Sequence, residues 1–203
     1  MKILDISTPL TNDTLVYPGD PKMLIRSKVK SGSVVSRASF GLHCGTHVDS
    51  PSHYIPGGKT VFELGLDRLN GPARVCDFTE VWWEITADDI GGEKIRRGDI
   101  ALFRTRNSKL MQRNEFRRDY TSLSAEAAEC LVRKKVPAVG IDYISIEKIG
   151  SSRVHKILLQ EEIPIIESLD LSLAKAGRYR LTCMPLKFLG TEASPARCVL
   201  SPL

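Results

Sequence analysis

The sequence predicts a domain of mixed α and β structure, and three observations lead to this prediction. The chain has 203 residues, which suits one domain with a sizeable core. Hydrophobic residues make up 42% and charged residues 26%, as in ordinary globular proteins. Short β-branched runs come first and two helix–strand units follow, which favours a single α+β domain over residues 1–203 rather than a helical bundle or a sandwich.

Eight short apolar or β-branched runs are typical of strands. They cover residues 3–6, 23–28, 34–40, 73–78, 100–103, 138–141, 163–166 and 180–184. Turn-forming residues separate them, for example at 17–20 and 31–33. The runs are short, as expected for strands in a compact sheet.

Two segments have the pattern of helices. Ser124 is a good cap for a helix over residues 124–134, which is rich in alanine and ends before Pro137. A second helix is expected over residues 152–161, with Val154, Ile157 and Leu158 on an apolar face. Each is followed by an apolar run, so both begin helix–strand units.

Three of the four histidines fall within eleven residues, and an aspartate lies between them. His43, His47 and Asp49 offer imidazole nitrogens and a carboxylate oxygen, which zinc and manganese accept as ligands. In a straight strand, His43 and His47 would be about 13 Å apart, too far to share an ion. The segment must therefore turn between them, and Gly45 permits the turn.

Pro51 disfavours helix at the preceding residue and redirects the chain. This change of direction can bring His53 back over the ions as a residue that does not bind them. Cys44 also lies in this segment. A small residue that fits is the favoured interpretation, and a thiolate ligand or nucleophile is the alternative.

The fourth histidine, His155, lies in the second predicted helix. Taken alone, it would be a surface histidine. Glu167 is its best candidate partner, because it ends the apolar run 163–166 and a strand end is a rigid base for a carboxylate.

The segment from His43 to His53 resembles the cyclase family of metal-dependent hydrolases, which includes bacterial kynurenine formamidase. It meets every fixed position of the family pattern H-x-G-T-H-x-D-x-P-x-H. Further similar segments lie at 5–10, 17–20, 54–58, 102–105, 140–142, 185–187 and 194–197. The resemblance thus spans nearly the whole chain.

The resemblance implies a swivelling β/β/α fold with a central β-barrel-like sheet and flanking helices. It also implies two divalent metal ions, zinc or manganese, with Asp49 bridging them, and a homodimer or homotetramer. The implied metal ligands are His43, His47, Asp49, His155 and Glu167. His53 would be the catalytic acid/base. Tyr17 stands where kynurenine formamidases typically carry tryptophan, and it would contact the substrate.

This arrangement is suited to hydrolysis. Two ions that share a carboxylate can lower the pKa of a bound water and give a hydroxide nucleophile, while an unligated histidine supplies the proton for the leaving group. We expect cleavage of a C–N amide bond, in an aryl formamide such as N-formylkynurenine. The alternatives are an isatin-type cyclic amide hydrolase and a catalytically decayed metal- or ligand-binding protein.

The remaining sequence features suggest no other class of partner. The N-terminus carries Asp5 and no long apolar run, so we expect neither a signal peptide nor a membrane partner, and a cytoplasmic location. The formal net charge is +5, with a basic segment at 104–118. That segment matches no nucleic-acid motif, so we expect a solvated loop or one that steers an anionic small-molecule substrate, and no nucleic acid.

Overall fold

Seven strands close into a barrel in the computed structural model, which describes residues 3–114 and 116–203. The barrel strands are β4 (His47–Asp49), β5 (Asn70–Phe78), β7 (Ile100–Thr105), β9 (Val139–Ile141), β10 (Ile165–Glu167), β11 (Gly177–Pro185) and β12 (Ala193–Pro202). Their order is β12, β11, β5, β7, β9, β10 and β4, and pairing of β4 with β12 completes the ring. A short strand, β1 (Leu4–Asp5), pairs with β12.

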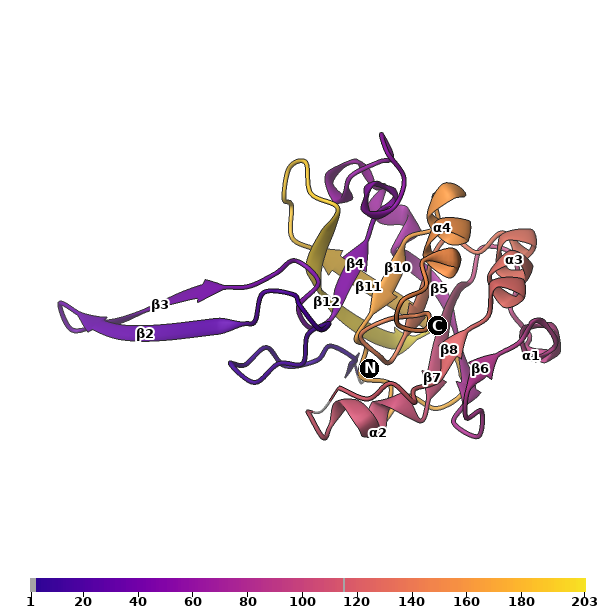
Figure 1. The fold of residues 1–203 in the computed structure, drawn as a ribbon, viewed down its shortest axis with the longest axis horizontal. Helices are drawn as coiled ribbons and strands as arrows, with labels where there is room; N and C mark the ends of the chain where they lie inside the picture. The colour runs from indigo at the N-terminus through magenta and orange to yellow at the C-terminus, as the bar shows by residue number, and fades with distance from the viewer. Residues whose placement is uncertain (1–2, 115) are drawn as a thin grey trace.

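The other elements lie outside the barrel (Figure 1). The helices are α1 (Ala87–Gly92), α2 (Asn107–Met111), α3 (Ala125–Lys134) and α4 (Arg153–Gln160). Single 3-10 turns are η1 (Pro51–His53), η2 (Val61–Glu63) and η3 (Leu66–Arg68). A small parallel pair joins β6 (Glu84–Ile85) to β8 (Ser122–Leu123), and a long ribbon joins β2 (Leu24–Lys30) to β3 (Ser33–Ser39). The predicted α+β fold with a barrel-like sheet and flanking helices is confirmed.

Both predicted helices are present, and local chemistry accounts for them. The Ser124 hydroxyl accepts a hydrogen bond from the backbone N–H of Ala127 at 3.0 Å, as a helix cap should. On α4 the buried face carries Leu158 and also His155, which is only 4% exposed. The interpretation of His155 as a surface histidine is therefore wrong.

Strands β7, β9 and β10 are buried on both sides, which explains their continuous apolar runs. Strands β5, β7, β9 and β10 are parallel neighbours. Leu102 and Ile166 belong to the core inside the barrel, whereas the adjacent Phe103 and Ile165 pack with residues of α3 and α4. Because both faces of such parallel strands are covered, their sequences are continuously hydrophobic instead of alternating.

The sequence reasoning missed β12, although it is the longest strand and closes the barrel. Its Pro195 and Pro202 lack the N–H that a central strand donates, and such residues argue against a strand. The short elements β4, β6, β8, α1 and α2 were also not predicted. No helix in the described ranges is long and apolar enough to cross a membrane. Residues 1 and 2, which entered the signal-peptide prediction, lie outside those ranges.

Candidate metal centre

The histidine-rich segment turns as the sequence predicts. Gly45 has φ +65°, a left-handed backbone conformation that favours glycine, and a Cβ there would also displace the end of the Leu10 side chain, whose Cδ2 would lie 2.4 Å away. The chain then enters β4 with His47 to Asp49 and leaves it through the extended Ser50. Pro51 opens the turn η1, which ends at His53. The turn returns the His53 ring to within 4.4 Å of the His43 ring.

Strand pairing brings the distant glutamate to this segment. Strand β10 runs antiparallel to β4, with Glu167 opposite His47 and Ile165 opposite Asp49. Since Ile165 packs in the core under the helices, Asp49 and the other side chains of that face point toward α4. His155 lies on α4, so the predicted ligands of both segments meet on this outer face of the barrel.

The side chains converge on the Asp49 carboxylate. Its Oδ1 lies 2.9 Å from His43 Nδ1 and 3.3 Å from His47 Nε2. Its Oδ2 lies 3.6 Å from His155 Nε2. Glu167 closes the cluster, with Oε1 3.3 Å from His155 Nε2 and Oε2 3.7 Å from His47 Nε2. Asp49 is therefore central to both halves of the cluster, as a bridging ligand would be.

The donor atoms fit divalent cations. In the described part of the chain, both Asp49 oxygens and His47 Nε2 are fully buried, and their close polar neighbours are the ring nitrogens and carboxylate oxygens of the same cluster. Buried polar atoms normally need a partner, and a divalent cation would satisfy all three of these atoms at once. Two groups of ligand atoms lie within 4.8 Å of one another, namely His43, Asp49 and His53, and His47, Asp49 and Glu167. Imidazole nitrogen and carboxylate oxygen suit zinc and manganese.

Electrostatic interactions within the cluster favour the charged forms of its histidines and of Asp49. Burial opposes charge on His43, but the Asp49 carboxylate outweighs it and raises the pKa of His43 to about 9. Burial also opposes charge on His155, yet the hydrogen bonds that its ring donates to the carboxylates of Asp49, Glu147 and Glu167 raise its pKa well above the usual value. Burial works against ionisation of Asp49, and His43 and His47 nevertheless hold its pKa well below the usual range. Metal binding at this site would release imidazole protons and weaken at low pH.

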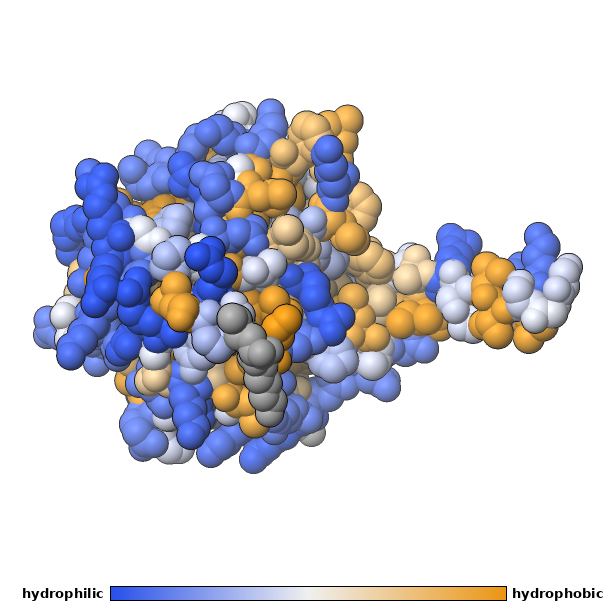
Figure 2. All heavy atoms as spheres, turned by 180° about the vertical axis from the view of Figure 1, so that it is seen from behind, coloured by the Kyte–Doolittle hydropathy of each residue, from blue (hydrophilic) through white to orange (hydrophobic). Residues whose placement is uncertain are grey.

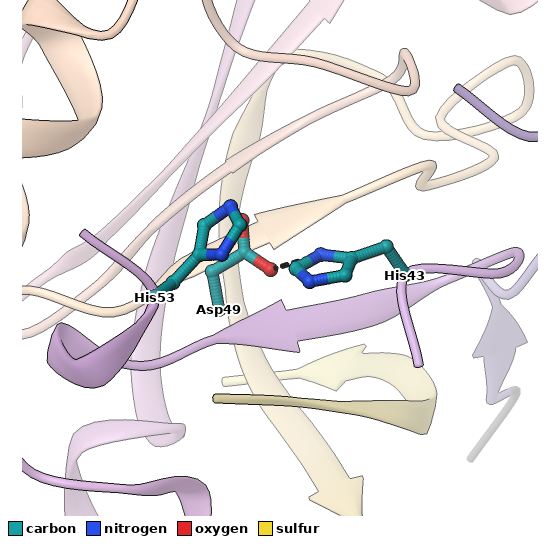
Figure 3. Close-up of side chains that lie close together, drawn as sticks. All are labelled: His43, Asp49 and His53. Atoms are coloured by element: carbon teal, nitrogen blue, oxygen red, sulfur yellow. Dashed lines mark ion pairs between the residues drawn. The ribbon is translucent and has the colours of Figure 1, made fainter. Parts of the chain in front are cut away.

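His53 differs from the other three histidines. It lies beside Asp49 and His43 (Figure 3) and reaches the site from η1, whereas His47 lies on β4 and His155 on α4. Burial, together with the nearby histidines, lowers the pKa of His53 to about 4, although Asp49 opposes this shift. Its imidazole is therefore neutral near pH 7. The same ring also belongs to one of the candidate ligand groups, so both roles are geometrically open.

A cavity of about 320 Å³ opens over the cluster. That volume is at the small end of the range for small-molecule sites. Tyr17, the predicted substrate contact, lines it, and the centre of its ring lies 6.4 Å from that of Phe116 in an edge-to-face contact. Tyr54 adds a second aromatic wall. The cavity thus combines aromatic surface with the carboxylate–imidazole cluster.

Two other sequence features lie away from the cluster. Cys44 is buried, burial raises the pKa of its thiol, and it belongs to neither candidate ligand group. In the basic segment, Arg104 pairs with Asp77 at 3.0 Å and the Arg106 guanidinium lies 4.6 Å from the Trp82 ring centre. Some of the positively charged side chains in this segment therefore interact with neighbouring residues of the same chain.

Comparison with known proteins assigns the family. The Cyclase family model matches residues 4–148. The kynurenine formamidase of Bacillus anthracis is 31% identical over 211 residues, which cover 100% of this chain and 98% of that protein.

The chain belongs to the Cyclase family.

Solved structures agree with this assignment. A structure described as a potential metal-dependent hydrolase with cyclase activity superposes on this Cyclase-family chain with a TM-score of 0.87 at 35% identity, covering 98% of this chain and 96% of that one. Isatin hydrolase A from Ralstonia solanacearum superposes with a TM-score of 0.86 at 22% identity, covering 98% and 91%. At 22% identity, the comparison with isatin hydrolase A shows a shared fold.

The sequence reasoning missed several residues of this Cyclase-family site. Those that line the cavity are Asp20, Tyr54, Ile144, Ser145, Lys148, Ser151 and Glu192. Glu192 lies 3.4 Å from His43 Nε2. Tyr54 could have been suspected, because it follows His53 directly. Asp20 belongs to the family-like segment 17–20, whereas the other lining residues come from segments without a local motif.

Proposed function

We propose that this protein is a metal-dependent hydrolase that cleaves a C–N amide bond, with an aryl formamide such as N-formylkynurenine as substrate. One observation carries the proposal: the buried Asp49 carboxylate lies among three imidazoles in the lining of a cavity. The full-length similarity to a kynurenine formamidase supports the choice of substrate.

The ligands proposed for one ion are His43, His47 and Asp49, and for the other Asp49, His155 and Glu167. The short distances from these five side chains to one another support a binuclear centre of zinc or manganese. Bound ions would polarise a substrate carbonyl and lower the pKa of a bound water.

His53 is the proposed acid/base. A neutral imidazole can take a proton from the attacking water and return it to the leaving nitrogen, whereas a metal-bound one could not do so as easily. Its place beside Asp49, but on a different element from the strand ligands, supports this role. Tyr17 and Tyr54 would contact the aromatic part of the substrate.

The decisive experiment compares two variants by metal content and by hydrolysis of N-formylkynurenine, isatin and simple aryl formamides, with and without chelator. His53→Ala should keep its metal and lose about 10²- to 10⁴-fold in kcat, since it removes only the acid/base. Asp49→Asn should lose both metal and activity.

Other outcomes would favour the alternatives. Faster turnover of isatin than of any formamide would indicate a cyclic amide hydrolase. Bound metal without turnover of any amide would indicate a metal- or ligand-binding protein. Loss of metal from His53→Ala would make His53 a ligand instead of the acid/base.

We further propose a homodimer or homotetramer that acts on a small molecule, with no nucleic-acid or membrane partner, in the cytoplasm. The exposed β2–β3 ribbon supports the oligomer, and five cysteines without a disulfide suit a reducing compartment.

A further inference from the structure

Glu147 lies behind the candidate metal centre rather than in it. It is 2% exposed, does not line the cavity, and belongs to neither candidate ligand group. Its carboxylate accepts hydrogen bonds from the Ser151 hydroxyl at 2.6 Å and from the backbone N–H groups of Val154 and His155 at 3.1 and 3.2 Å. It also makes a short hydrogen bond to His155 Nδ1. All these contacts are with the start of α4 and the residues just before it.

The contact with Nδ1 decides which nitrogen of the His155 ring points toward the candidate metal centre. Nδ1 is turned toward Glu147, and Nε2 is turned toward Glu167 Oε1 and Asp49 Oδ2. A neutral imidazole carries one N–H and one lone pair, so a carboxylate that accepts the Nδ1 proton leaves the lone pair on Nε2. A cation among the carboxylates would meet that lone pair.

We propose that Glu147 is a positioning residue for His155, which it orients and keeps in the tautomer that presents Nε2 to a divalent cation. The inference rests on the proposed function, because it takes His155 to be a metal ligand. A carboxylate behind a metal-binding histidine fixes the ring and makes it a stronger donor.

Neighbouring hydrogen bonds hold other predicted ligands in a similar way. His47 is held in the same way, with its Nδ1 2.8 Å from the Gly45 carbonyl oxygen and its Nε2 toward the cluster. The backbone N–H of Ile146 donates to Glu167 Oε1 at 2.7 Å. Two adjacent residues, Ile146 and Glu147, therefore hold the two predicted ligands that come from the second half of the chain.

Glu147 also caps α4, whose N-cap residue Ser152 makes no side-chain capping bond. The test must separate this structural role from positioning of His155. Ser124→Ala is the matched control, because Ser124 caps the adjacent helix α3 and touches none of the predicted ligands. It should lower the midpoint of urea unfolding and leave metal affinity unchanged.

The experiment titrates metal-free wild type, Glu147→Gln, Glu147→Ala and Ser124→Ala with Zn²⁺ and Mn²⁺ by calorimetry. Glu147→Ala should bind at least one ion 10- to 100-fold more weakly, and Glu147→Gln, which keeps the shape without the charge, about tenfold more weakly. In zinc-loaded protein, the exchangeable Nδ1 proton of His155 should be visible by NMR in wild type and lost or shifted in Glu147→Ala.

The failures are distinguishable. Wild type that binds neither ion would overturn the proposed function itself. Wild type that binds while Glu147→Gln binds with equal affinity would overturn only the role of Glu147. Should Glu147→Ala not fold, the Glu147→Gln titration alone decides.

Discussion

At the scale of single residues, carboxylates in this protein behave according to what surrounds them. Asp142 lies at the end of β9, fully buried, and accepts hydrogen bonds from the hydroxyls and backbone N–H groups of Thr105 and Ser108, at 2.6 to 3.2 Å. It ties the end of β7 to the start of α2. Burial nevertheless raises the pKa of Asp142 to about 6, against 3.8 for the free side chain.

The sign of this shift gives a prediction. Because the folded-state pKa lies above the unfolded value, protonated Asp142 stabilises the fold. This stabilisation is complete below about pH 4 and is lost as the pH rises to about 6. The loss is about 1.4 kcal/mol per pH unit in that window. Asp142→Asn cannot ionise at this position and lacks this pH dependence. The difference in free energy of unfolding by which wild type exceeds Asp142→Asn should therefore shrink as the pH rises.

Urea unfolding of both proteins between pH 4.5 and 7.5, with chelator present to exclude metal binding, measures that difference. A difference that instead widens with rising pH would mean that the four donors outweigh burial and keep the carboxylate charged.

At the scale of elements, α3 shows how a helix end is determined. Lys135 follows the helix in the left-handed conformation, with φ 57° and ψ 48°, and is exposed. This is the position at which glycine is preferred, because a side chain is strained there.

Lys135→Gly should therefore increase the free energy of unfolding by about 1 kcal/mol. Lys134→Gly, one residue earlier and still helical, should decrease it by about 1 kcal/mol. Urea midpoints of the two variants test the pair, and a Lys135→Gly protein less stable than wild type would contradict the assignment of the helix end.

At the scale of the whole molecule, the β2–β3 ribbon stands apart from the barrel (Figure 1). Its turn has positive φ at Ser31 and Gly32, as a tight hairpin requires. Val29 and Val34 pair across the ribbon and are 75% and 71% exposed. Hydrophobic atoms continue along it toward the body (Figure 2). An isolated two-stranded ribbon is barely stable in water, so we expect another copy of the chain to cover it.

Sedimentation should therefore give a mass of two or four times 22.5 kDa. Replacing Val29 and Val34 by serine should shift the equilibrium toward the single chain, because it removes apolar surface from the contact. Leu173→Ser, at a residue 78% exposed on the body, is the control and should leave the mass unchanged. A wild-type protein that sediments as one chain would contradict the proposed oligomer.

Much of this architecture could be predicted from the sequence, because its signals are local. Ser124 and Pro137 mark the two ends of one helix. The continuous apolar runs of the central strands follow from their burial on both sides. His43, His47 and Asp49 are close in the sequence, and the need for a turn at Gly45 follows from chain geometry alone.

The tertiary structure decided the rest. Nothing in the local sequence sets the register that places Glu167 opposite His47, or the closure by β12, whose prolines conceal a strand. Glu147 carries no motif, and its importance comes only from the His155 ring that it touches. Residue types and short spacings define what chemistry a segment can perform. Contacts between segments more than a hundred residues apart depend on the packing free energy of the whole barrel, which no short stretch of sequence contains.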